Sequence, residues 1–194
     1  MRGSDDPIGR FQELFARAQA TEEGETTAAA LATADVGGRP SARMVLLKGV
    51  DAQGFVFYTN FESRKGRELA ANPQAALCFH WQRLRIQVRV EGAVERVAAA
   101  ESDAYFASRP RGHQLGAWAS SQSSPLGSRE ELLARVADTE ARFAGKDVPR
   151  PPFWGGFRLR PDRLEFWHAQ DDRLHDRLLY TLGRDGWRIE RLFP

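Results

Sequence analysis

The sequence predicts a mainly β fold with added helices (α+β class), in which antiparallel strands form a closed or partly closed barrel and the helices lie outside it. Short runs of alternating apolar and polar residues recur along the chain, and tight turns separate most of them. Strands joined by such turns pair antiparallel. With 194 residues, 42% of them hydrophobic and 28% charged, the chain has the size and composition of one globular domain.

The first predicted element is a helix that begins at Asp6-Pro7. Asp is a favourable N-cap, and Pro suits the first helical turn. Apolar residues then recur at helical spacing, at Ile8, Phe11, Leu14, Phe15 and Ala18. Residues 1–5 are expected to be a flexible tail, and residues 6–194 a single domain.

Strands and one short helix are predicted next. Gly37-Gly38 and Gln53-Gly54 are turn signals, Ser63 is a helix cap, and Asn72-Pro73 ends that helix. The elements follow in the order Ala28–Val36, Ala42–Val50, Phe55–Thr59, the helix Arg64–Ala71, Ala75–Phe79 and Arg85–Val97.

The second half of the chain is predicted to form helices and then strands. One helix, Ala98–Ser108, stops near Pro110, and Ser128 with Glu131 forms the capping box of another. After a loop at Gly145–Pro152, turns at Pro161-Asp162 and Arg184-Asp185-Gly186 divide the strands Gly156–Arg160, Arg163–Trp167, Arg177–Leu182 and Trp187–Leu192.

Several classes of protein are excluded by what the sequence lacks. It has no apolar run long enough for a membrane span and no apolar segment typical of a secretory signal, so a cytoplasmic location is expected. P-loop and Rossmann glycine motifs are absent, and the four histidines have no metal-ligand spacing, so no metal is expected. A net charge of only +2 argues against a nucleic-acid partner.

Cationic residues at the ends of predicted elements are the candidate binding groups. Arg43 and Lys48 fall on opposite faces of one strand, where they bracket apolar residues. Arg64 and Lys65 open a helix, and a helix N-terminus attracts anions. Tyr105, Arg109 and Arg111 surround a helix end, where basic residues also suit the helix dipole.

A third group follows near the C-terminus. If Arg173, His175 and Arg177 lie on an extended strand, they share one face, which either is exposed to solvent or meets an anion. Trp154 and Trp167 either pack in the core or flank a planar ligand. Taken together, these residues indicate a site for phosphorylated, planar ligands and leave the reaction open.

Nine segments of the chain, in order, resemble those of the pyridoxine/pyridoxamine 5′-phosphate oxidases, over about residues 6–194. They are RMVLLKGVD, FVFYTN, SRKGRELAANP, QVRVEG, YFASRPR, GAWAS-SQSS, FWGGFRL, EFW and RLHDRLLY. The resemblance implies a split β-barrel that binds FMN and works as a homodimer with active sites at the interface. It also implies oxidation of pyridoxine or pyridoxamine 5′-phosphate to pyridoxal 5′-phosphate, with hydride transfer from C4′ to flavin N5 and reoxidation by O₂ to give H₂O₂.

The resemblance also assigns expected roles to residues. The residues expected to bind FMN are Arg43, Met44, Val45, Leu46, Leu47, Lys48, Tyr58, Thr59, Arg64, Lys65, Gln87, Gln122, Ser123, Trp167 and Arg177. Those expected to bind the substrate are Lys48, Tyr105, Arg109, His113, Arg173 and His175. Within that second set, Arg173 and His175 are expected to be catalytic.

The chain departs from the family pattern at two places. His113 stands where the family usually has serine, and His168-Ala169 stands where it commonly has Gln-Gly. Both departures fall on the substrate side, so two alternatives stay open: a related oxidase with another substrate, such as a phenazine precursor, and a non-catalytic FMN-binding module.

Overall fold

The computed structural model describes residues 6–194, and the expected tail at residues 1–5 lies outside them. The helices are α1 (Pro7–Thr21), α2 (Arg64–Ala71), α3 (Ala99–Ser108), α4 (Arg111–Ala119), α5 (Arg129–Arg142) and the 3₁₀ turn η1 (Asp171–Arg173). The strands are β1 (Ala28–Ala34), β2 (Pro40–Leu46), β3 (Gly49–Asp51), β4 (Gly54–Asn60), β5 (Gln74–Trp81), β6 (Ile86–Arg96), β7 (Trp154–His168), β8 (Asp176–Gly183) and β9 (Gly186–Leu192). Within residues 6–194, no helix is long and apolar enough to cross a membrane.

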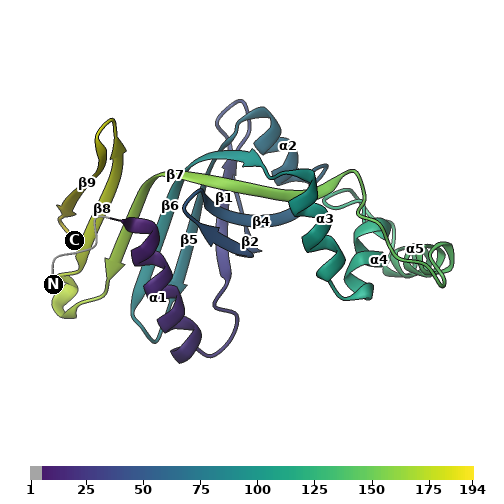
Figure 1. The fold of residues 1–194 in the computed structure, drawn as a ribbon, viewed down its shortest axis with the longest axis horizontal. Helices are drawn as coiled ribbons and strands as arrows, with labels where there is room; N and C mark the ends of the chain where they lie inside the picture. Colours follow the sequence, from purple (N-terminus) through teal and green to yellow (C-terminus); the bar gives the residue numbers. More distant parts are fainter. Residues whose placement is uncertain (1–5) are drawn as a thin grey trace.

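The strands form one curled antiparallel sheet, which confirms the predicted fold class (Figure 1). Its main path runs β2-β1-β5-β6-β7-β4-β3, and the β8–β9 hairpin pairs with β7. One edge of β7 pairs with two strands in succession, β4 along Trp154–Leu159 and β8 along Arg163–His168. The sheet is therefore split along β7, and the two halves of this strand belong to opposite ends of the molecule.

The prediction of a turn at Pro161-Asp162 was wrong. Residues Trp154–His168 form one strand, and the register with β6 shifts between Glu91 and Gly92. A Cβ on Gly92 would lie 2.1 Å from the backbone oxygen of Arg160, so only glycine lets the two strands approach here. The bulge thus absorbs Pro161 without ending the strand.

The predicted strand Ala42–Val50 is also interrupted. β2 ends at Leu46, the chain bends at Leu47 and Lys48, and β3 begins at Gly49. The residues between Arg43 and Lys48 are not all core, because Met44 and Leu46 are 64% and 39% exposed. Alternation along β2 therefore turns two apolar side chains outward, towards the cleft described below.

The main core lies between α1 and the concave sheet. Phe11 of α1 is fully buried, and its ring lies 4.8 Å from that of Phe55 and 5.0 Å from that of Phe79. Asp6 accepts a hydrogen bond from the Ile8 amide, as predicted for the helix cap. Because α1 closes the core on one side of the sheet, the outer face of β2 and the ends of β4 and β7 remain available for a site.

The helices α3, α4 and α5 gather at one end of the sheet, opposite the β8–β9 hairpin in the view of Figure 1. The sequence analysis missed α4, since Pro110 was interpreted as a stop, whereas it is the N-cap of this next helix. A second, smaller apolar cluster fixes this helical end to the sheet, with Phe106, Leu115, Phe143, Val148 and Trp154 at its centre.

Candidate functional site

A cleft of about 350 Å³ opens between the end of β2, β4, α2 and the helical end of the sheet. It contains a large share of the predicted binding residues. Its lining consists of Met44, Val45, Leu46, Lys48, Tyr58, Thr59, Lys65, Tyr105, Arg109, His113, Gln122 and Trp154. All of these except Trp154 were predicted from the sequence.

Segment 43–48 is divided among three environments. Met44, Val45, Leu46 and Lys48 line the cleft, and the Lys48 amide donates to the Val56 oxygen at 2.8 Å, which anchors the bend to β4. Leu47 instead packs into the core and is 5% exposed. Arg43 lies outside the lining and pairs with Glu68 of α2. The expected cofactor contacts thus include one residue, Leu47, that the fold places in the core.

Stacked aromatic rings form one wall of the cleft. The rings of Tyr58 and Tyr105 stack with centroids 3.9 Å apart, and Trp154 stacks on Tyr58 at 5.5 Å. A Cβ on Gly156 would lie 2.8 Å from the Tyr58 ring, so the glycine of the FWGGF segment makes room for this stack. Burial is the main cause that raises the pKa of Tyr58 to about 12, so this phenol stays neutral and can donate a hydrogen bond.

Lys65 is the cation at the start of α2 that faces the cleft. Its Nζ donates to Gln122 Oε1 at 2.7 Å and to Ser63 Oγ at 3.1 Å, and Thr59 Oγ1 donates to the same Gln122 oxygen at 3.2 Å. Burial, reinforced by the charge of Arg43, lowers the pKa of Lys65 to about 8. A nearby anion would favour the charged form of this lysine.

Arg109, the C-cap residue of α3, carries the second half-buried cation of the cleft. Its guanidinium carbon lies 4.6 Å from the centre of the Trp154 ring, and burial lowers its pKa. Its Nη1 is buried and has no hydrogen-bond partner among the described residues. A buried cationic donor of this kind is unfavourable unless an acceptor meets it, so the cleft fits an anionic ligand.

Two predicted phosphate contacts, Arg43 and Arg64, do not line the cleft. Both contact the buried carboxylate of Glu68, with Arg43 Nη2 at 3.2 Å and Arg64 Nε at 2.8 Å. Both arginines are neighbours of Lys65, which does line the cleft. Arg64 precedes Lys65 in the chain, and the charge of Arg43 contributes to the lowered pKa of Lys65. We therefore place Arg43 and Arg64 at the margin of the cleft. Ser123, also predicted, has a positive φ of 71° and is exposed outside the lining.

The remaining predicted residues form a second group at the other end of β7. Trp167 in β7 is the cross-strand neighbour of Gln87 in β6 and of Arg177 in β8, so the three residues lie in one row across the sheet. Arg177 Nε donates to the buried Glu165 at 2.8 Å. The His175 ring lies 4.5 Å from the Trp167 ring. Tryptophan, imidazole and guanidinium therefore share one surface, as a planar anionic ligand would require.

The condition under which Arg173, His175 and Arg177 would share one strand face is not met. Arg173 belongs to η1 and has a positive φ of 60°, and β8 begins only at Asp176. His175 Nδ1 accepts a hydrogen bond from the Gln170 amide at 3.2 Å, which closes this loop. A turn, and not the strand alternation, thus sets the positions of Arg173 and His175.

His168, one of the two departures, points away from this group. It follows Trp167 in β7, so the two side chains project from opposite faces of the sheet. Burial, reinforced by the charge of Arg10 in α1, lowers the pKa of His168. This departure therefore faces α1 and not the surface shared by Trp167 and His175.

The cleft and the second group cannot meet within one chain. Trp154 and Trp167 mark them at opposite ends of β7, and a strand of that length spans roughly 40 Å at about 3.3 Å per residue. Figure 1 shows the same separation between the β8–β9 hairpin and the helical end.

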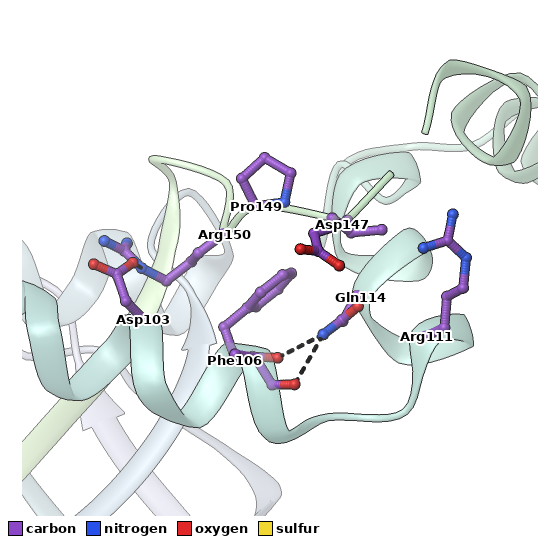
Figure 2. Close-up of a pocket in the computed structure, with 9 residues that line it drawn as sticks. Asp103, Phe106, Arg111, Gln114, Asp147, Pro149 and Arg150 are labelled. Atoms are coloured by element: carbon purple, nitrogen blue, oxygen red, sulfur yellow. Dashed lines mark hydrogen bonds and ion pairs between the residues drawn. The ribbon is translucent and has the colours of Figure 1, made fainter. Parts of the chain in front are cut away.

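A second cavity of about 410 Å³ lies among α3, α4 and the loop before β7. Figure 2 shows the Gln114 side chain hydrogen-bonded to backbone oxygens of α3. Arg150 pairs with Asp103 at 2.6 Å, and the Gln114 amide donates to the Phe106 oxygen at 3.0 Å. Arg111 donates to the Phe143 oxygen at 2.7 Å, so this predicted cationic residue supports a loop and does not enter the cleft.

A curled antiparallel half-barrel that carries a cationic, aromatic-lined cleft defines a split-barrel protein. Residues 16–143 match the family model of pyridoxamine 5′-phosphate oxidase, and residues 154–194 match that of the pyridoxine 5′-phosphate oxidase C-terminal dimerisation region. The chain belongs to the pyridoxamine 5′-phosphate oxidase family and is an oxidoreductase.

Curated relatives support this placement over nearly the full chain. The pyridoxine/pyridoxamine 5′-phosphate oxidase of Myxococcus xanthus (strain DK1622) is 63% identical over 97% of this chain and 92% of its own. The protein of the same name from Anaeromyxobacter dehalogenans (strain 2CP-C) is 59% identical over 97% and 96%.

Solved structures share the fold. PhzG from Burkholderia lata 383, in complex with tetrahydrophenazine-1-carboxylic acid, superposes with a TM-score of 0.94 at 35% identity and covers 100% of this chain and 95% of its own. A pyridoxamine 5′-phosphate oxidase-related, FMN binding protein from Nostoc punctiforme PCC 73102 superposes with a TM-score of 0.76 at 17% identity, over 97% and 98% of the two chains.

Proposed function

We propose that the chain catalyses the FMN-dependent oxidation of pyridoxine 5′-phosphate, pyridoxamine 5′-phosphate or both to pyridoxal 5′-phosphate, with O₂ as acceptor and H₂O₂ as product. The single observation that carries this proposal is the buried, unpartnered Nη1 of Arg109 in an aromatic-lined cleft. The names of the relatives that are 59–63% identical point to the same substrates. The cytoplasmic location expected from the sequence stays a prediction.

FMN supplies hydride acceptance from C4′ of the substrate and reaction with O₂ when it is bound. The residues that would hold it belong to both groups. Lys65, with Arg43 and Arg64 at the margin of the cleft, would receive the cofactor phosphate, and Gln122 would position Lys65 through its 2.7 Å hydrogen bond. Trp167 and Arg177 would complete the site with Gln87.

The substrate phosphate would be held by Lys48, Tyr105, Arg109 and His113, which all line the same cleft. Charge-assisted hydrogen bonds from these groups would fix both affinity and orientation. His113 supplies a ring nitrogen where the family usually has a hydroxyl. These four residues, called the phosphate clamp below, would thus hold the phosphate at one end of the substrate and leave the ring free for Arg173 and His175.

Arg173 and His175 would orient the pyridine ring and assist the loss of the substrate proton. They lie at the far end of β7, so they would reach a cleft only on a second copy of the chain. A homodimer with two active sites at its interface follows from this arrangement, and the match to a dimerisation region over residues 154–194 supports it.

Turnover with and without the substrate phosphate tests the proposal. The FMN-loaded protein is expected to convert pyridoxine 5′-phosphate to pyridoxal 5′-phosphate with stoichiometric H₂O₂. We expect kcat/KM for unphosphorylated pyridoxine to be lower by at least about a hundredfold, because buried cations would be left unpaired. Absence of turnover with either phosphorylated vitamer, in a protein that binds FMN, would reject the proposal in favour of a binding module.

A second candidate is oxidation of a larger, tricyclic substrate. The observation that favours it is the TM-score of 0.94 with PhzG, whose crystal structure holds tetrahydrophenazine-1-carboxylic acid. The carboxylate of that acid carries less negative charge than the phosphate monoester of pyridoxine 5′-phosphate, so it needs fewer cations in the site. Turnover of that acid at a higher kcat/KM than pyridoxine 5′-phosphate would favour this candidate.

A further inference from the structure

A buried carboxylate of α2 lies outside the cleft lining and was not among the predicted site residues. Glu68 is 7% exposed. Its Oε2 accepts hydrogen bonds from Thr33 Oγ1 at 2.5 Å, from Ser41 Oγ at 2.6 Å and from Arg43 Nη2 at 3.2 Å. Its Oε1 accepts one from Arg64 Nε at 2.8 Å. One carboxylate therefore ties two strands and two guanidinium groups together.

All four neighbours act as donors towards Glu68, so only an acceptor with two free oxygens satisfies them. Burial by itself raises the pKa of Glu68, but the hydrogen bonds from Ser41, Thr33 and Arg64 and the charge of Arg43 outweigh it and lower the pKa to about 2. The group is thus ionised throughout the range in which the protein would work.

The cluster continues into the cleft through Lys65. The charge of Arg43 contributes to the low pKa of Lys65, so the two cations lie close together. The three cations and Glu68 sum to a charge of about +2, which matches the roughly −2 of a phosphate monoester.

We propose that Glu68 is a positioning residue for the cofactor phosphate, which holds Arg43 and Arg64 in place beside Lys65 before the phosphate binds. The inference rests on the proposed function, because it takes the phosphate of FMN as the anion. Arginine side chains have many rotamers, and ordering them at the moment of binding weakens affinity. A carboxylate that orders them beforehand removes that cost while the cluster keeps its net positive charge.

The variant Glu68→Gln separates positioning from simple charge. Removal of a negative charge would, by Coulomb attraction alone, tighten phosphate binding. Loss of positioning would weaken phosphate binding instead. The NH₂ group of glutamine is a donor, and it would face a donor from which the carboxylate oxygen accepted a hydrogen bond. We expect the Kd for FMN, measured by quenching of flavin fluorescence, to rise by about tenfold or more. The Kd for riboflavin, which lacks the phosphate, should stay the same.

Glu62→Gln is the matched control. Glu62 is exposed and precedes the N-cap of α2, so this variant removes the same charge near the start of the same helix without touching the guanidinium groups of Arg43 and Arg64. Its Kd for FMN should stay within about twofold of the wild-type value. In an Arg43→Ala/Arg64→Ala background, Glu68→Gln should add no further loss, because the residues through which it acts are gone.

Ser41→Ala keeps the carboxylate and serves if Glu68→Gln does not fold. It removes one hydroxyl that bridges Arg43 and Glu68, and it should raise the Kd for FMN about threefold. An unchanged or lower Kd for FMN in Glu68→Gln, or an equal loss for riboflavin, overturns the positioning role. If the wild-type protein itself shows no preference for FMN over riboflavin, the proposed flavin phosphate site fails and the positioning role fails with it.

Discussion

Trp154 and Trp167 lie at opposite ends of one strand, β7, and each stands in a different half of the candidate site. Trp154 stacks on Tyr58 in the cleft, whereas Trp167 contacts His175 near the C-terminus. The strand separates them by roughly 40 Å. This relationship explains why the predicted residues divide into two groups, which the proposed function unites across two chains.

Mixed dimers should recover activity from two inactive variants. Arg109→Ala damages the cleft, and Arg173→Ala damages the group at the other end of β7, so each variant alone is expected to lose nearly all turnover. When both chains are unfolded and refolded together, half of the dimers are mixed, and each mixed dimer has one intact site. The mixture should therefore show about a quarter of wild-type activity. No recovery would place both groups in the same chain's site.

The affinity for FMN should fall as the pH rises through the pKa of Lys65. In the free protein, burial and Arg43 lower this pKa to about 8 from the ordinary 10.5. A bound phosphate favours the charged form, so binding takes up a proton above pH 8. Between pH 7 and pH 9 the Kd should rise by about tenfold. Equilibrium titrations with flavin fluorescence measure it.

Lys65→Arg provides the comparison, because arginine stays charged over this range. Its Kd for FMN should be nearly constant between pH 7 and pH 9. A wild-type Kd that does not change with pH would show that Lys65 does not meet the phosphate. The lowered pKa of Lys65 also affects the stability of the fold. Between about pH 8 and 10.5, Lys65 is protonated in the unfolded chain and largely deprotonated in the folded one, so its contribution makes the folded state more stable as the pH rises.

His113→Ala should weaken the substrate and spare the cofactor. His113 lines the cleft beside Arg109, in the part assigned to the substrate phosphate. Loss of one donor to a charged group is expected to raise KM for pyridoxine 5′-phosphate by about tenfold. Steady-state kinetics and an FMN titration check both values. An unchanged KM would remove His113 from the clamp.

Gly92→Ala should destabilise the whole sheet. A Cβ at this position would lie 2.1 Å from the Arg160 oxygen, which is a backbone atom of the paired strand β7. We expect the free energy of unfolding to fall by about 2–3 kcal/mol in urea titrations. Gly112→Ala in α4 is the control, because open space surrounds that position and helix propensity should add up to about 1 kcal/mol. Equal stability of both variants would contradict the close approach at the bulge.

Local signals predicted much of the fold. Asp6 and Ser63 cap their helices as expected, and the predicted strand Arg85–Val97 matches β6 to within one residue at each end. These features depend on neighbours in the chain, so a sequence pattern shows them. The turn proposed at Pro161-Asp162 failed because a glycine on a different strand, Gly92, makes the bulge that tolerates proline.

The candidate site, like the fold, was predicted from the sequence only in part. The cleft residues on β2, β4 and α3 lie in short motifs, and the resemblance found them. For Trp154 the sequence left two roles open, packing in the core or contact with a planar ligand. Nothing in the residues around it shows that it stacks on Tyr58. Glu68 looked like one polar position of a helix, since its partners Thr33 and Ser41 come from distant strands. Contacts between remote segments were thus the part that periodicity did not reveal.

One anaerobic spectrum tests the central claim most directly. The FMN-loaded protein is mixed with pyridoxine 5′-phosphate in the absence of O₂, and the visible absorbance band of the flavin is followed. The proposed function predicts that the band bleaches while one equivalent of pyridoxal 5′-phosphate forms, and that air restores it. A bound flavin that stays yellow with both phosphorylated vitamers would contradict the account.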